Sequence, residues 1–152
     1  MNMKFYLKIS SILVAAAFLS TLPVEAQTFR QTKQGITGTT QGMDIEIQFV
    51  SPEIVRVVKA PEGRSFTKKS FSVVKSPESM SVTTEKKGET VSLKSNAVRV
   101  DFNVRTGRIS FFDKQGKALF TEKDYGAQFT PFNDAGNQTF SVRQPAAVPD
   151  HR

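Results

Sequence analysis

Acidic side chains are the first residues whose type could support chemistry in this sequence. Two carboxylates can act as acid and base, or as acid and nucleophile, when they converge on one bond in a pocket. The available acids stand at the polar positions of alternating segments or in turns, and we expect a solvated surface around each. These acids are Glu46, Glu53, Asp101, Asp113 and Glu122. We therefore predict no catalytic residue within this chain.

Histidine and cysteine chemistry is restricted by composition. The single histidine, His151, is followed only by Arg152, and the chain has no cysteine. A histidine-based metal site or a Ser/His/Asp triad cannot be assembled from these residues, and neither disulfides nor thiol chemistry is available. No glycine-rich phosphate loop precedes a helical pattern, which argues against nucleotide binding. We expect neither a metal nor a cofactor.

Aromatic residues among small polar ones suggest a different kind of site. Residues 124–140, DYGAQFTPFNDAGNQTF, hold Tyr125, Phe129 and Phe132 between Gly, Asn, Asp and Pro, a composition typical of a loop. A flat ring can stack on the apolar face of a pyranose while amides and carboxylates bind its hydroxyls. The same aromatics could instead fasten a long loop to the edge of a sheet. Both interpretations stay open at this point.

The charge balance is basic but dispersed. The chain holds 21 Lys and Arg against 14 Asp and Glu, a formal net charge of +7. Proteins that bind nucleic acids cluster their basic residues on one face or one helix. Here the basic residues are spread along alternating segments with acids between them, so we expect no nucleic-acid partner.

The first 26 residues have the order of a secretory signal peptide. Lys4 and Lys8 precede an apolar run over residues 9–19, and a small-residue cleavage site ends at Ala26. This run is shorter than the roughly 20 residues needed to span a bilayer, which favours cleavage over a membrane anchor. We expect an exported protein, periplasmic or extracellular, with no membrane partner after cleavage.

Alternating residues predict strands along the rest of the chain. Residues 43–49, MDIEIQF, alternate apolar and polar side chains without a break, the period of a half-buried strand. Residues 53–60 and 70–75 are further runs rich in β-branched side chains. Glycine turns at Gly88, Gly107 and Gly116 join further candidates, which are residues 80–85, 89–95, 97–104, 108–113 and 117–122. Turn signals recur about every nine to fifteen residues, which favours an antiparallel β-sandwich or meander.

The stretch RISFFD, residues 108–113, tests the register of this arrangement. In a strand, Ile109 and Phe111 share one face while Ser110 and Phe112 share the other. We predict that Phe111 lies between the sheets and that Phe112 faces outward.

Three stretches together resemble a known family. They are MDIEIQFVSPEIVRVVKAPEG (residues 43–63), VRVDFNVRTGRISFFDKQGKALFTE (98–122) and a final strand QTFSVRQ (138–144). The succession is similar to the N-terminal β-sandwich of the glycoside hydrolase family 31 enzymes, the α-glucosidase and α-xylosidase group, over about residues 34 to 144. The most specific pieces are the SPEIVRV strand and the DFNVRTGRISFFDKQGK double turn.

The resemblance implies a galactose mutarotase-like sandwich that precedes a catalytic (β/α)8 barrel. It places the catalytic aspartates of the family on that barrel, so this chain by itself is expected to be a non-catalytic piece of an α-glycosidase. Carbohydrate and the barrel are the partners implied for the full-length enzyme. We expect a signal peptide at residues 1–26, the sandwich at 27–144, and an irregular tail at 145–152 from a truncated or frameshifted end. The alternative is a free-standing secreted sandwich for carbohydrate binding or adhesion, with residues 125–140 as its glycan-binding loop.

Overall fold

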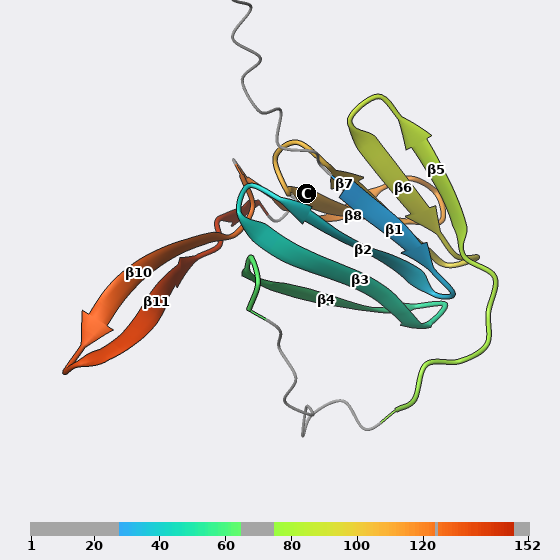
Figure 1. Cartoon of the computed structure of the whole chain (residues 1–152). Coiled ribbons are helices and arrows are strands. Elements are labelled where there is room, and N and C mark those ends of the chain that lie inside the picture. The colour runs from blue at the N-terminus through green and yellow to red at the C-terminus, as the bar shows by residue number, and fades with distance from the viewer. Residues whose placement is uncertain (1–27, 65–74, 124, 148–152) are drawn as a thin grey trace, which may run out of the picture.

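The computed structural model describes residues 28–64, 75–123 and 125–147, which form strands, turns and loops without a helix (Figure 1). Four antiparallel strands make the first sheet, in the order β1-β2-β3-β4. Their bounds are β1 (Thr28–Thr32), β2 (Gly35–Thr40), β3 (Met43–Ser51) and β4 (Ile54–Pro61). None of the described residues form a helix that is long and apolar enough to cross a membrane.

Six antiparallel strands make the second sheet, in the order β12-β9-β8-β7-β6-β5. Their bounds are β5 (Thr83–Lys87), β6 (Thr90–Lys94), β7 (Val98–Asn103), β8 (Ile109–Asp113), β9 (Ala118–Glu122) and β12 (Ala146–Ala147). A separate two-stranded hairpin of β10 (Gln128–Asp134) and β11 (Asn137–Arg143) projects beyond both sheets (Figure 1).

The core lies between the two sheets. Strand β3 supplies one side chain in every two, as its sequence pattern predicts, and Ile47 and Phe49 are fully excluded from solvent. The core cluster joins Ile36, Met43, Ile45, Ile47 and Phe49 of the first sheet to Val91, Leu93, Val100, Phe102 and Ile109 of the second. Burial of apolar surface contributes about 25 cal/mol per Å². The predicted all-β antiparallel sandwich is confirmed.

The register of β8 is also as predicted. Ile109 is buried and Phe111 packs against the core cluster, where its ring meets the edge of Phe120 at 5.9 Å between centroids. Phe112 lies on the other face beneath the guanidinium of Arg99, 4.2 Å from the ring centroid. The two neighbouring phenylalanines thus serve opposite faces of the sheet.

Residues 124–140 are not the loop that their composition suggests. They contain β10, the turn and the first residues of β11, because Ala135 and Gly136 have φ of +48° and +90° and so form a two-residue hairpin turn. Pro131 is tolerated because the outer edge of a two-stranded ribbon needs no ladder hydrogen bond. The sequence signal for this hairpin was the Ala135-Gly136 dipeptide between Asp134 and Asn137.

The remaining differences concern the ends of the fold. Strands β1 and β2 were not predicted, since their short Thr-rich sequences alternate weakly. Strand β12 pairs with β9 and so extends the second sheet beyond residue 144, into the expected irregular tail. The predicted signal peptide and residues 70–74 of a predicted strand lie outside the described residues.

Candidate functional site

A buried ion pair joins the two sheets. Lys59 on β4 reaches across the sandwich to Glu122 on β9, with its Nζ 2.6 Å and 2.8 Å from the two carboxylate oxygens. Only 6% of the Lys59 side chain and 2% of the Glu122 side chain are exposed. Burial of two charges in this way is costly unless further polar partners satisfy them.

Those partners are present. The Lys59 ammonium also donates to the carbonyl of Gly107 at 2.9 Å. Glu122 accepts the backbone N–H of Ile109 at 2.8 Å and the side-chain amide of Gln144 at 2.6 Å. The three ammonium protons and the carboxylate oxygens are therefore engaged, and the pair links the two sheets.

Two opposing effects act on the pKa of Lys59. Burial lowers the pKa of its ammonium, while the hydrogen bonds and the negative charge of Glu122 oppose that effect, and the net pKa lies below its ordinary value.

The prediction that Glu122 is solvated was wrong. Glu122 shares a face of β9 with Phe120, whose ring contacts Phe111. Because side chains alternate along a strand, residues 120 and 122 face the same way, and an inward Phe120 therefore implies an inward Glu122. The sequence could not name the partner, since Lys59 lies 63 residues away.

The other acids occupy surface or turn positions. Asp113 accepts the backbone N–H groups of Gln115 and Lys117 and so caps its turn. Glu46 pairs with Arg56 on the outer face of the first sheet. In the part of the chain that the structure describes, no three His, Cys, Asp or Glu residues gather as metal ligands.

The ion pair also holds both ends of the β10–β11 hairpin. Gln144 follows β11 and donates to Glu122, while Gly126 precedes β10 and packs directly on the pair. A Cβ atom at Gly126 would lie 2.7 Å from the Glu122 carboxylate and 2.8 Å from the Lys59 ammonium. Gly126 also has a φ of +69°, which favours glycine. The direction of the hairpin is thus set from the inside of the sandwich.

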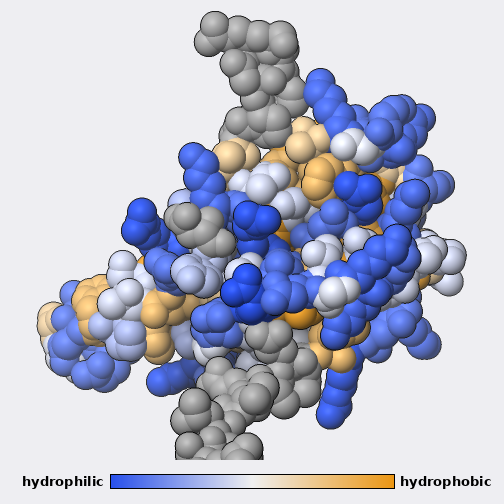
Figure 2. Space-filling view, turned by 90° about the horizontal axis from the view of Figure 1, so that it is seen from above, coloured by the Kyte–Doolittle hydropathy of each residue, from blue (hydrophilic) through white to orange (hydrophobic). Residues whose placement is uncertain are grey.

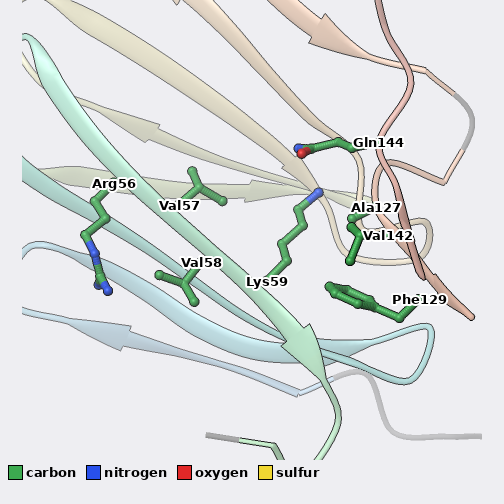
Figure 3. A pocket seen from close by; sticks show the side chains of 8 residues that line it. All are labelled: Arg56, Val57, Val58, Lys59, Ala127, Phe129, Val142 and Gln144. Atoms are coloured by element: carbon green, nitrogen blue, oxygen red, sulfur yellow. The ribbon is translucent and has the colours of Figure 1, made fainter. Parts of the chain in front are cut away.

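An open groove of about 460 Å³ lies between strand β4 and the hairpin. Figure 3 shows Lys59 extending from β4 toward Gln144, with Phe129 and Val142 across the groove. Strand β4 is the edge of its sheet, so one side of its backbone is unpaired within the described sheet. The groove therefore combines apolar walls with a free strand edge.

The hairpin exposes apolar side chains. Phe132 and Val142 are 46% and 58% exposed, and Figure 2 shows apolar surface on the projecting hairpin at the left. Isolated two-stranded hairpins are marginally stable in water, so such a ribbon usually packs against another element. Val142 and Phe132 lie on opposite faces of the hairpin, and only the face of Val142 and Phe129 adjoins the groove.

Of the three aromatics singled out in the sequence, Tyr125 and Phe129 line a common pocket and Phe132 does not. Phe129 packs against the core, which agrees with an anchoring role. Tyr125 is 51% exposed and lines, with Phe129, a pocket of about 340 Å³ beside the turn between β2 and β3. Phe132 stands apart on the hairpin.

Comparisons with known proteins match this architecture. The chain matches the glycosyl hydrolase 31 N-terminal galactose mutarotase-like domain over residues 44–147. A search of curated proteins found no match. Among solved structures, a GH31 α-xylosidase from Xanthomonas citri superposes with a TM-score of 0.69 at 29% identity, over 80% of this chain and 14% of that one.

A GH31 dextranase from Flavobacterium johnsoniae, complexed with glucose, superposes with a TM-score of 0.56 at 21% identity, over 68% of this chain. At this identity the likeness concerns the fold alone. The chain spans about 14% of the length of either enzyme. The family match covers more than half of the chain and extends from β3 to β12. This protein belongs to the family of glycosyl hydrolase 31 N-terminal galactose mutarotase-like domains.

Proposed function

We propose that this chain serves as the non-catalytic N-terminal domain of an exported family 31 α-glycosidase of the α-xylosidase or α-glucosidase type. The family match and the likeness to an α-xylosidase support this proposal. Catalysis requires carboxylates that flank the scissile bond at a set separation. Glu122, the buried acid of this sandwich, is already held by Lys59 and Gln144.

The observation that carries the proposal is the surface formed by the groove and the hairpin. Val142 and Phe129 line the groove on the hairpin side, and Val57 lines it on the β4 side. An apolar strip of this kind is typical of an interface between domains. We infer that the catalytic (β/α)8 barrel of the enzyme packs here, and that the Lys59–Glu122 pair orients the hairpin toward it.

The remaining parts of the proposal concern substrate and location. Carbohydrate is the substrate of the full-length enzyme, and contacts with it are made in that context. The order of residues 1–26 supports export to the periplasm or the medium, since a charged start, an apolar run and a small-residue site follow one another.

Two measurements test the proposal. DNA sequencing beyond codon 152, read in all three frames, should find sequence that encodes a barrel, and an unrelated gene there would contradict it. The purified chain should leave aryl α-xylosides and α-glucosides intact. Hydrolysis that survives repurification and follows the protein peak would overturn the non-catalytic assignment.

An interface test addresses the groove. If the barrel-containing enzyme is recovered, Val142→Glu should weaken the contact between domains and lower its thermal midpoint. Thr130→Glu, on the other face of the same hairpin, is the matched control and should have little effect. Equal effects of the two variants would exclude the groove as the contact.

The exposed rings of Tyr125 and Phe132 favour a second candidate, a free-standing sandwich that binds glycans through its hairpin. In that case DNA beyond codon 152 would encode no barrel, and glycan affinity would fall in Phe132→Ala.

A further inference from the structure

The outer face of the second sheet carries an ordered set of polar side chains. Cross-strand pairing aligns Asp101 with Ser92 and Ser110, and the next row outward aligns Arg99 with Phe112. In a third row, Thr90 pairs with Asn103. Arg108 is next to Asn103 in this row, because the backbone N–H of Asn103 donates to the carbonyl of Arg108 at 2.8 Å. Since alternate residues face the same way, these three rows share the face opposite the core.

A depression of about 170 Å³ lies in this face. Its lining comes from β6, β7 and β8 together with Arg108 just before β8, and consists of Thr90, Asp101, Asn103, Arg108, Ser110 and Phe112. This volume is below the range of drug-sized pockets, roughly 300–1,000 Å³, and suits a single small ring.

Several polar groups in the depression retain unused hydrogen-bonding capacity. Asp101 accepts the Ser92 hydroxyl through Oδ1 at 2.8 Å, while its Oδ2 has no hydrogen-bonded partner among the described residues. The Ser110 hydroxyl and the Arg108 guanidinium likewise make no hydrogen bond within the described parts of the chain. A carboxylate acceptor, a hydroxyl and a cationic donor thus surround one small space.

The ring of Phe112 forms an apolar wall that is held in place. Arg99 stacks on it at 4.2 Å from the centroid. The Arg99 Nε lies 3.3 Å from Asp101 Oδ1 but has no hydrogen-bonded partner among the residues that the structure describes, so stacking and charge position the guanidinium.

We propose that this depression is a surface subsite for one pyranose unit of a glycan. Phe112 would contact the C–H groups of the sugar ring, and Asp101, Ser110 and Arg108 would bind its hydroxyls. Charged groups are depleted from the centres of protein interfaces, so a mostly polar hollow with one aromatic wall suits a sugar better than a docked domain. The subsite shares only its ligand class with the proposed function and does not depend on the barrel.

The test is a titration followed by nuclear magnetic resonance, on the protein recovered from expression of the full coding sequence. Isomaltotriose and methyl α-D-xylopyranoside are the probes, and sodium sulfate is the control for simple anion binding. At millimolar sugar, the amide signals of Asp101, Ser110 and Phe112 should shift, and those of the hairpin should not.

Variants sharpen the assignment. Phe112→Leu keeps an apolar side chain but removes the flat ring, and should weaken binding about tenfold, the equivalent of 1.4 kcal/mol. Ser110→Ala, which removes no hydrogen bond within the described residues, should weaken it measurably and serves if Phe112→Leu unfolds. Phe132→Leu on the hairpin should bind as the parent does.

Three results would overturn the proposal. They are the absence of shifts with either sugar in a folded protein, equal shifts with sulfate, and shifts confined to Tyr125 and the hairpin that carries Phe132. None of these results depends on hydrolytic activity, so the subsite can fail while the proposed function stands.

Discussion

Lys59 and Glu122 form an ion pair of 2.6 Å between the two sheets, with both side chains almost fully buried. The pair connects β4, the Gly107 turn and β9, and through Gln144 it reaches the base of the hairpin. An interaction of this kind is strongly destabilising when one partner is removed alone, because the other charge stays buried.

Loss of the Lys59 amine should therefore be severe, because its hydrogen bonds to Gly107 and Glu122 are lost and the Glu122 carboxylate stays buried without that partner. We expect Lys59→Met to lower the free energy of unfolding by about 3–5 kcal/mol, measured by urea denaturation. The matched control is Lys75→Met, because Lys75 and Glu78 pair at 2.6 Å with 50% and 47% of their side chains exposed. That variant should cost less than about 1 kcal/mol. Similar losses in both variants would show that the buried pair is not the anchor.

The pH dependence of stability has a definite sign at Lys59. Burial lowers the pKa of this group in the folded protein below its ordinary value of 10.5. Between the two pKa values the unfolded chain binds more protons than the folded one, so this group makes folding more favourable as the pH rises. Urea melts between pH 8 and pH 10 should show the parent gaining stability relative to Lys59→Met. A relative loss would mean that Glu122 raises the pKa more than burial lowers it.

Substitution of Gly126 by alanine should lower stability more than the same substitution at a glycine with a similar backbone φ. An alanine at Gly63, where φ is +73° and the added Cβ atom would meet no described residue within 4 Å, should cost about 1–2 kcal/mol from backbone strain alone. Gly126→Ala adds a contact with the ion pair to the same strain and should cost clearly more. Thermal unfolding of the two variants measures the difference, and equal midpoints would contradict the packing described here.

Phe111 and Phe112 should differ in their effect on stability. Phe111→Ala empties a site against the core and should cost about 3 kcal/mol, near the lower end for buried phenylalanine because the ring is only partly buried. Phe112→Ala loses the contact with Arg99 and should cost less than about 2 kcal/mol. Urea denaturation decides between them, and a larger loss at Phe112 would reverse the register of β8.

The predicted signal peptide implies a defined first residue in the exported protein. Mass spectrometry of protein recovered outside the cytoplasm should find Gln27 as the first residue, in open or cyclised form, because cleavage is expected after Ala26. Recovery of an intact Met1 on that protein would contradict it.

Local pattern determined most of the sandwich. The alternation in residues 43–49 identified β3 and its buried face, and the glycine turns at Gly88, Gly107 and Gly116 identified the hairpins of the second sheet. These features depend on neighbours along the chain, so the sequence reveals them directly. The alternation of side chains along residues 108–113 likewise predicted that Phe111 and Phe112 lie on opposite faces of the sheet.

Tertiary structure decided what lies far apart in the sequence. Glu122 was expected at the surface because the acids stand at the polar positions of alternating segments or in turns, and only the stacking of the sheets brings Lys59 to within 2.6 Å. The projection of the β10–β11 hairpin likewise follows from the position of Gln144 and Gly126 on that pair. The depression beside Phe112 arises because three strands align their side chains in register. A buried charge, a groove and a subsite are properties of several strands together, and sequence spacing alone does not determine them.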